Sequence, residues 1–252
     1  MRPFVQYYDA TYSDKDYGKD NEIFRSIVKP AHRPKILEIG SGTGNQTLLI
    51  AQWADVVAVE MDTDFSQVMR QKIAAQPAIT IFEGDIGKLE DSNFDGAGAF
   101  FNVINYIHGR DALLHFFRSI AERLKLGAAM VCDMWHAEAV LLDGPKETTR
   151  IKHYDNYLGK GTVTQTIVPT LNEQTRAIAL DYNISYESQH GSIIPAPFVE
   201  RIDMFLWLEH EMIDVLHEAG FDEIEFYDGR NYPSPMTPES WTLWVVARKR
   251  NI

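Results

Sequence analysis

The chain has 252 residues, enough for one large domain or for a core domain that carries an inserted subdomain. The hydrophobic fraction of 45% and the charged fraction of 24% exclude a disordered, collagen-like or coiled-coil protein. The net charge of −12 disfavours a nucleic-acid partner, because the phosphate backbone would be repelled.

Expectations about compartment and metal content follow from features that the sequence lacks. The N-terminus has no apolar signal region, and no run approaches the roughly 18 apolar residues of a membrane-spanning helix. The single cysteine, Cys132, can form neither an internal disulfide nor a thiolate metal cluster. His210 and His217 have no further ligand in register. We therefore expect a cytoplasmic protein with no membrane partner and no metal site.

Residues 34–134 alternate short apolar runs with longer amphipathic stretches, as strands and helices around a parallel sheet do. The runs are apolar throughout, which is typical of strands covered by helices on both faces. The sequence therefore predicts a doubly wound α/β fold. The predicted strands are 35–39, 56–59, 78–82, 96–101 and 128–133, and the predicted helices are 45–53, 64–75 and 110–125, the last ended by Gly127.

After Trp135 the pattern changes to alternating segments rich in Thr, Ile, Val and Tyr, separated by turn residues. This pattern predicts an inserted antiparallel β-meander. Its strands are expected at 149–157, 161–169, 175–187 and 199–206. A helix at 209–219, ended by Gly220, and strands at 221–227 and 241–247 should then return to the wound sheet. The expected domains are 1–33, a core of 34–148 with 207–252, and the insertion 149–206.

Three glycines within five residues follow the first predicted strand. Gly40, Ser41, Gly42 and Gly44 belong to the segment Ile36-Leu-Glu-Ile-Gly-Ser-Gly-Thr-Gly-Asn-Gln46. The glycines lie between a predicted strand and a predicted helix. Without Cβ atoms the backbone can turn sharply and bring its N–H groups close to a ligand. The dinucleotide-binding fingerprint begins in the same way, so the glycines alone do not identify the ligand.

Two neighbouring residues distinguish a dinucleotide-binding loop from a loop that binds another cofactor. Where the dinucleotide fingerprint has its third glycine, this chain has Asn45, and Glu38 lies in the strand immediately before the loop. A carboxylate at that position would repel a pyrophosphate but attract a sulfonium or ammonium group. The charge pattern therefore favours S-adenosylmethionine over NAD as the cofactor.

The segment Glu38-Ile-Gly-Ser-Gly-Thr-Gly44 resembles motif I of the class I S-adenosylmethionine-dependent methyltransferases. The resemblance implies that Glu38 and the glycine loop hold the methionine part of the cofactor. It also implies a seven-stranded mixed sheet of order 3-2-1-4-5-7-6, with the cofactor at the carboxyl ends of the strands.

The same resemblance assigns the adenosine part of the cofactor to two acidic positions. Glu60, which ends the second strand, would bind both ribose hydroxyls, because one carboxylate can accept hydrogen bonds from two hydroxyl groups. Asp85, after the third strand, would meet the adenine amino group. Met61 and Ile86 would complete the adenine site.

A narrower resemblance lies at the N-terminus. Tyr8-Asp-Ala-Thr-Tyr-Ser-Asp-Lys-Asp-Tyr17 is similar to the Y-D-x-x-Y-x-x-K-D-Y opening of certain small-molecule methyltransferases, including sugar N,N-dimethyltransferases of macrolide pathways. In those proteins the segment folds over the cofactor as a lid, with tyrosines near the transferring methyl group. Residues 1–33 are therefore expected to form a helical lid, with Tyr12 at the methyl group and Tyr17 at the cofactor.

Two further segments carry the narrower resemblance. Phe101-Asn-Val-Ile-Asn-Tyr106 resembles the F-S-S-I-G-[YH] of those enzymes, which implies Phe101 at the cofactor and Tyr106 at the acceptor. It departs from that pattern at Asn102 and Asn105. Asp133-Met-Trp-His-Ala-Glu138 is loosely similar to their P-W-W-x-P-E, and His136 follows the fifth strand at the rim of the expected pocket.

The sequence thus predicts methyl transfer to a nitrogen of a small polar metabolite such as an amino sugar. Tyr12, Tyr106 and His136 are the candidate catalytic residues, and the insertion 149–206 should cover the acceptor site. Three alternatives remain open: an O-methyltransferase, an NAD-dependent oxidoreductase, and a non-catalytic cofactor-binding assembly module. Whether the chain forms a homodimer is also open.

Overall fold

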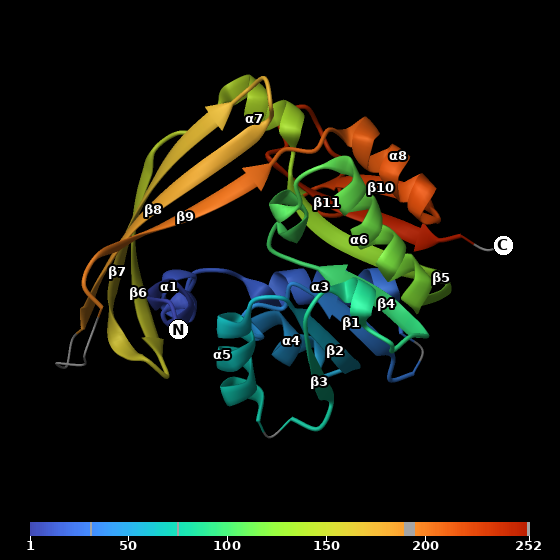
Figure 1. The fold of residues 1–252 in the computed structure, drawn as a ribbon, viewed down its shortest axis with the longest axis horizontal. Coiled ribbons are helices and arrows are strands. Elements are labelled where there is room, and N and C mark those ends of the chain that lie inside the picture. The colour runs from blue at the N-terminus through green and yellow to red at the C-terminus, as the bar shows by residue number, and fades with distance from the viewer. Residues whose placement is uncertain (31, 75, 189–194, 251–252) are drawn as a thin grey trace.

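The computed structural model describes residues 1–30, 32–74, 76–188 and 195–250. Two β-sheets dominate it, and the larger one holds seven strands in the order β10-β11-β5-β4-β1-β2-β3 (Figure 1). The strands from β1 to β5 run parallel, whereas β11 and β10 are antiparallel to their neighbours. The strands are β1 (Lys35–Ile39), β2 (Asp55–Glu60), β3 (Ile79–Glu83), β4 (Phe94–Ala99), β5 (Leu124–Trp135), β10 (Phe221–Asp228) and β11 (Thr242–Lys249). Numbered along the chain as seven strands and read from the β3 edge, with β10 as the sixth strand and β11 as the seventh, the order is 3-2-1-4-5-7-6. The predicted fold class is therefore confirmed.

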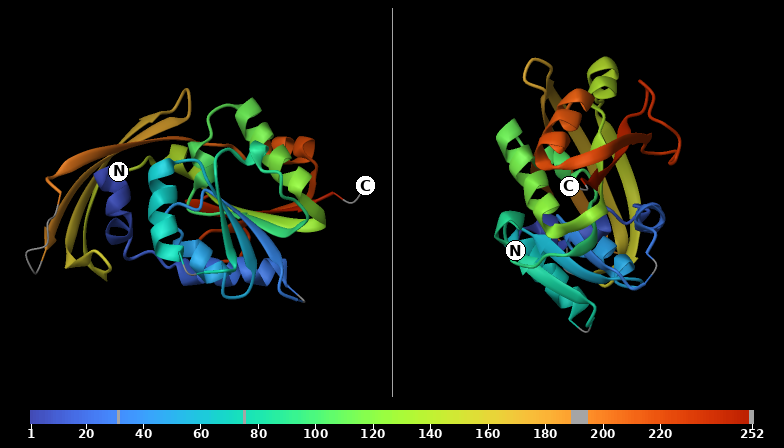
Figure 2. Two further views of the ribbon diagram at one scale, coloured as in Figure 1. Left: turned by 60° about the horizontal axis from the view of Figure 1, so that its bottom comes forward. Right: turned by 90° about the vertical axis from the view of Figure 1, so that its right-hand side faces the viewer.

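Helices cover both faces of this sheet, which explains why its central strands β1, β2 and β4 are buried along nearly their whole length (Figure 2). Successive residues of a strand point to opposite faces, so Ile36 packs toward α3 (Tyr17–Val28), α4 (Asn45–Ile50) and α5 (Thr63–Ile73). Its neighbour Leu37 packs toward α6 (Arg110–Arg123) and α8 (Glu209–Ala219). Asp62 caps α5 by accepting from the backbone N–H groups of Asp64 and Phe65, and the predicted end of this helix at Ala75 lies outside the described residues.

The prediction that Gly127 ends α6 is wrong. The helix ends at Arg123, and β5 begins at the next residue. Gly127 lies inside β5 with a φ of 72°, and the pairing of β4 with β5 shifts register between Phe94 and Gly96. The glycine therefore permits an irregularity at the start of a strand, which needs the same left-handed backbone as a helix end.

The predicted meander is a separate four-stranded antiparallel sheet of order β6-β7-β8-β9. Its strands are β6 (Thr148–Asn156), β7 (Gly159–Asn172), β8 (Ala177–Ser188) and β9 (Phe198–Phe205). The short helix α7 (Ala137–Asp143) precedes it. One face of this sheet packs on the N-terminal helices α1 (Pro3–Gln6) and α2 (Tyr8–Thr11), which lie between the two sheets (Figure 1).

Asn105 joins both ends of the insertion to the core. This fully buried residue lies in the 3-10 helix η2 (Val103–Tyr106), which follows β4. Its Nδ2 donates to the carbonyl oxygen of Phe205 at 2.9 Å, and its Oδ1 accepts from the backbone N–H of Trp135 at 2.9 Å. One side chain therefore holds the end of β5, from which the chain leaves the sheet, beside the end of β9, from which it returns.

None of the helices in the described part of the chain is both long and apolar enough to cross a membrane.

Candidate active site

The glycine loop between β1 and α4 takes the left-handed backbone that its glycines permit. Gly40, Gly42 and Gly44 have φ angles of 70°, 57° and 83°. A Cβ added at Gly40 would lie 2.5 Å from Val103, and one added at Gly44 would lie 2.8 Å from Met69. A Cβ at Gly42 would meet nothing within 4 Å. The outer two glycines are therefore required by packing, whereas the middle one borders open space that a ligand can enter.

This open space belongs to a cavity between the glycine loop and the N-terminal segment. Six residues that the sequence assigned to the cofactor line it, namely Tyr17, Glu38, Gly40, Ser41, Gly42 and Phe101. The sequence reasoning missed Tyr8, Lys15, Thr43, Asn45, Gln46 and Phe100, which also line it. Gly44 lies in the same loop, between two lining residues.

Glu38 brings a buried acid to this cavity. Only 2% of the residue is exposed, and burial raises the pKa of its carboxyl to about 8. Its Oε2 has no hydrogen-bond partner among the described residues. A buried oxygen without a partner is costly, so this atom is suited to receive a donor or a cation from a bound ligand.

Lys15 places the opposite charge at the same cavity. Its ammonium lies 4.7 Å from the ring centroid of Phe101 and 5.3 Å from that of Tyr17, and it pairs with Asp20 at 2.5 Å. The lysine stands in the motif that suggested the lid, but the sequence interpretation considered only its tyrosines.

Glu60 lies against the glycine loop. Its Oε2 accepts from the backbone N–H of Gly42 at 2.7 Å, and its Oε1 accepts from that of Asp62 at 2.9 Å. Burial raises the pKa of this carboxyl, and the two backbone donors oppose the shift. The acid at the end of β2 is thus tied to the loop after β1, although 18 residues separate it from Gly42 in the sequence.

The residues predicted for the adenine site follow β2 and β3. Met61 is 67% exposed, so its side chain is available to a ligand. Asp85 caps the 3-10 helix η1 (Ile86–Lys88) by accepting from the N–H of Gly87 at 2.7 Å. Ile86 is buried in the core below it. None of the three lines the cavity at the glycine loop, and their contact with adenine remains a prediction.

The turn after β4 holds Phe101 at the edge of the cavity. Phe101 and Asn102 have φ angles of 69° and 62°, a left-handed conformation that is unfavourable for residues other than glycine. The half-buried carboxylate of Asp133 accepts from the backbone N–H groups of both residues, at 3.2 Å from that of Asn102. Burial raises the pKa of Asp133 to about 6. We infer that Asp133 stabilises this turn and thereby fixes the Phe101 ring.

Three tyrosines from distant segments meet beside this turn. The ring of Tyr12 packs edge-on against Phe101 at 4.9 Å, and its hydroxyl is hydrogen-bonded to Tyr182 of β8. Tyr106 in η2 is half-exposed and close enough to interact electrostatically with Tyr12 and Tyr182. Tyr12 and Tyr182 are thus in contact, Tyr106 lies near them, and the roles of Tyr12 and Tyr106 at the methyl group remain predictions.

His136 lies apart from this group, at the start of α7. Only 4% of it is exposed. Its Nδ1 lies 2.8 Å from the carbonyl oxygen of Ser240, and its Nε2 lies 3.1 Å from a carboxylate oxygen of Glu138. Both ring nitrogens therefore have partners, and a catalytic role for His136 remains a prediction.

The sheet order, the glycine loop after β1 and the acid at the end of β2 together define the fold of class I S-adenosylmethionine-dependent methyltransferases. Residues 36–127 match the sequence profile of a methyltransferase domain family. The chain therefore contains a methyltransferase domain, and the resemblance noted in the sequence is confirmed.

Solved structures with the same fold span nearly the whole chain. The sugar N-methyltransferase KedS8 from Streptoalloteichus sp. is 19% identical with a TM-score of 0.75, and the match covers 97% of this chain and 93% of that one. The S-adenosylmethionine-bound amino pentose methyltransferase CalS10 from Micromonospora echinaspora is 16% identical with a TM-score of 0.74, and the match covers 99% of both chains. At these identities the likeness shows the fold, including the insertion.

A curated relative matches over a shorter stretch. The ribosomal RNA small subunit methyltransferase A of Synechococcus sp. (strain JA-3-3Ab) is 38% identical over 90 residues, which are 31% of this chain. The chain thus spans about a third of the length of this relative, since the match covers 32% of it.

Proposed function

We propose that the chain transfers a methyl group from S-adenosylmethionine to a nitrogen of a small polar metabolite such as an amino sugar. The observation that carries this proposal is the cavity where the open side of Gly42 meets the unpartnered carboxyl oxygen of Glu38. A sulfonium and an ammonium group both satisfy such an oxygen.

The charges of the cavity fit the amino-acid end of this cofactor. Glu38 would take the ammonium group and Lys15 the carboxylate, because the two side chains bring opposite charges to one cavity. Glu60 would receive the ribose hydroxyls with its remaining lone pairs. Met61, Asp85 and Ile86 would contact the adenine. When bound, the cofactor supplies an activated methyl group.

Glu38 should make cofactor affinity depend on pH. A carboxyl with a pKa of about 8 must lose its proton before it can pair with a cation, so affinity should fall as the pH drops below 8. The expected loss approaches tenfold per pH unit between pH 8 and pH 6. Calorimetric titration with S-adenosylmethionine measures it. Glu38→Gln is the control, because it removes the titration of Glu38 and keeps that of Glu60, Asp133 and the ligand's own amine. An equal pH dependence in both proteins would contradict the assignment.

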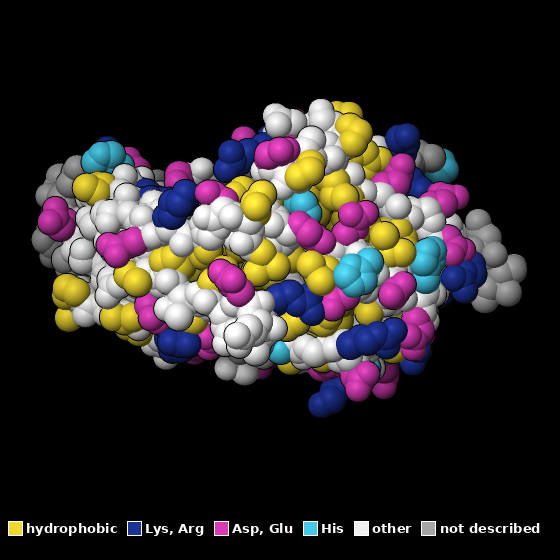
Figure 3. Space-filling view, turned by 90° about the horizontal axis from the view of Figure 1, so that it is seen from above, with side chains coloured by type: hydrophobic (Ala, Val, Ile, Leu, Met, Phe, Trp, Pro, Cys, Tyr) yellow, Lys and Arg dark blue, Asp and Glu magenta, His cyan; other side chains and the backbone are white. Residues whose placement is uncertain are grey.

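The acceptor would lie between the core and the insertion 149–206, which we propose covers it, while residues 1–33 close over the cofactor. Tyr12 stands at this boundary, next to the Phe101 ring that borders the cofactor cavity, and Tyr106 lies close enough to Tyr12 to interact with it electrostatically. A band of hydrophobic side chains runs from the insertion toward the core on the face seen in Figure 3. We propose that apolar side chains at this boundary help to keep water from the methyl group, while the hydroxyls of Tyr12 and Tyr106 orient the acceptor.

Nitrogen suits the described residues better than oxygen does. A neutral amine attacks with its own lone pair and can release a proton after the new bond has formed, whereas an alcohol needs a base during transfer. Burial raises the pKa of Tyr12 well above its usual value, so it stays protonated. The carboxylate of Asp133 is occupied by backbone donors, and His136 has partners at both ring nitrogens.

Tyr12 and Tyr106 should act by position. Tyr12→Phe and Tyr106→Phe are each expected to lower turnover by less than about tenfold, because the ring remains in place. The alanine variants should lose more, because acceptor alignment is lost. Single-turnover transfer of a radiolabelled methyl group measures both series. A thousandfold loss in either phenylalanine variant would indicate general-base chemistry and hence an oxygen acceptor.

Two measurements test the proposed function. In a thermal-shift assay S-adenosylhomocysteine should stabilise the dialysed protein and NAD should not, because only a ligand of the native state raises its stability. Transfer from radiolabelled S-adenosylmethionine is then compared for amino sugars, their hydroxyl analogues and ribosomal RNA. Labelling of the amino sugars alone supports the proposal. Labelling of the hydroxyl analogues or of the RNA would show that the proposed amine acceptor is wrong. Binding of the cofactor without any methyl transfer would favour a non-catalytic module.

A further inference from the structure

Asp9 connects the N-terminal segment to the glycine loop through side-chain hydrogen bonds. Its Oδ1 accepts from the Thr43 hydroxyl at 2.6 Å and from the Asn45 amide at 2.9 Å. Its Oδ2 accepts from the ammonium of Lys72, in α5, at 2.5 Å. Lys72 also donates to Oδ1 of Asn45 at 2.7 Å, so Asp9, Asn45 and Lys72 form a closed ring of hydrogen bonds.

This ring is partly buried and reaches the insertion as well. The Asp9 side chain is 9% exposed and that of Lys72 is 15% exposed. Burial lowers the pKa of Lys72, and Asp9 opposes that shift. Tyr157, in the turn between β6 and β7, is hydrogen-bonded to Asp9, and the Lys72 ammonium lies 5.9 Å from its ring centroid. Asp9 therefore contacts the core and the insertion at once.

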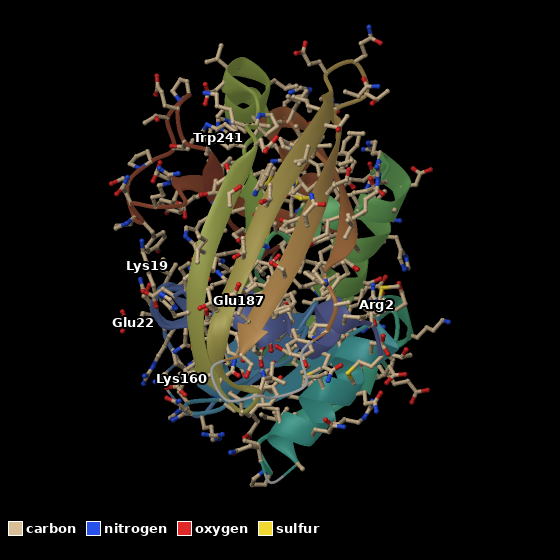
Figure 4. The ribbon with its side chains drawn as sticks, turned by 90° about the vertical axis from the view of Figure 1, so that its left-hand side faces the viewer. Arg2, Lys19, Glu22, Lys160, Glu187 and Trp241 are labelled. Atoms are coloured by element: carbon tan, nitrogen blue, oxygen red, sulfur yellow. The ribbon has the colours of Figure 1, made fainter. Side chains whose placement is uncertain are left out.

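The same short helix carries residues that face both binding sites. Thr43 and Asn45 line the cofactor cavity on either side of Gly44, and Asp9 holds both side chains. Tyr12 ends the helix three residues later and packs on Phe101 and Tyr182. In Figure 4 the N-terminal helices lie behind the strands of the insertion, toward the end marked by Lys160 and Glu187.

We propose that Asp9, held by Lys72, is a positioning residue that couples the conformation of the cofactor loop to the placement of Tyr12. This inference rests on the proposed function. With the ring formed, the loop is held in the cofactor-binding conformation and Tyr12 is held at the acceptor side. Because coupling is reciprocal, cofactor binding should in turn stabilise the N-terminal segment.

The test measures binding of S-adenosylhomocysteine by calorimetry and amide hydrogen exchange in residues 3–17. In the wild type the ligand should slow exchange in this segment. Asp9→Ala and Lys72→Met should each weaken binding by about 10- to 30-fold and remove the ligand-induced protection. The double variant should lose no more than about the larger single loss, because both changes break one ring. Asp9→Asn keeps an oxygen for Thr43 and Asn45, so we expect it to restore part of the affinity.

The matched control is the ion pair of Arg176 with Glu211, a partly buried bidentate pair with distances of 2.5 and 2.7 Å that joins the start of β8 to α8. Arg176→Met should lower stability but leave S-adenosylhomocysteine affinity within twofold of the wild type. If the Asp9 and Lys72 variants also bind within twofold, the ring only stabilises the fold and the inference is wrong. If the wild type itself does not bind, the proposed function fails instead.

Discussion

Gly42→Val should abolish binding of S-adenosylhomocysteine while the protein stays folded. The new side chain would occupy the open side of the glycine loop, where no protein atom lies within 4 Å of the added Cβ. It also forces a β-branched residue to a φ of 57°, a strain of roughly 1–2 kcal/mol. Calorimetry measures the binding, and urea unfolding measures the cost to stability.

Gly220→Val is the control that separates the effect of backbone strain from the effect of filling the cofactor cavity. Gly220 ends α8 with a φ of 98°, and a Cβ there also meets nothing within 4 Å, but it lies outside the set of cavity-lining residues. We expect a comparable loss of stability and unchanged affinity. If Gly42→Val retains affinity within threefold, the loop is not the surface that contacts the cofactor.

Glu60→Ala should weaken cofactor binding by about 2–4 kcal/mol, which is roughly 30-fold to several hundredfold. Two losses add up in this variant. The proposed charge-assisted bonds to the ribose disappear, and the backbone N–H of Gly42 loses the acceptor that holds the loop. Circular dichroism should show an unchanged fold, because the removed carboxyl was itself penalised by burial.

Glu83→Ala is the control for this position. Glu83 ends β3 directly beside Glu60 in the sheet register, but it is part-exposed and paired with Arg70 at 2.6 Å. Its removal should leave the affinity within twofold of the wild type. An equal effect of the two alanine variants would mean that cofactor affinity depends on the total charge at this edge of the sheet. The proposed hydrogen bonds from the ribose hydroxyls to Glu60 would then be wrong.

The strands of the parallel sheet and the cofactor loop could be predicted because each is encoded within a short stretch of sequence, whereas the order of the strands followed from the resemblance to the methyltransferases. Buried parallel strands are continuous apolar runs, and the loop is marked by its glycines and by Glu38. A local signal can nevertheless be ambiguous. Gly127 indicated a left-handed backbone correctly, but that backbone lies in a strand irregularity and not at a helix end.

The remaining parts of the site depend on contacts between segments far apart in the chain. Lys72 meets Asp9 across 63 residues, and although Asp9 stands in the N-terminal motif, no local pattern marks Lys72 as its partner. The partners of His136 include the carbonyl of Ser240, 104 residues away, so the sequence could place the histidine at the rim without revealing that its ring is engaged. Tyr182 is one of two tyrosines in β8, with Tyr186, and only the packing of the insertion shows which of them contacts Tyr12.

Asn105 fixes where the chain leaves the parallel sheet and where it comes back. Because this one side chain bonds both Trp135 and Phe205, the end of β5 and the end of β9 are held at neighbouring positions. A change in the length of strands β6 to β9 therefore does not need to alter the register of the parallel sheet. The insertion is still not independent of the cofactor loop, because Tyr157 is hydrogen-bonded to Asp9, and a replacement for strands β6 to β9 would have to keep this contact.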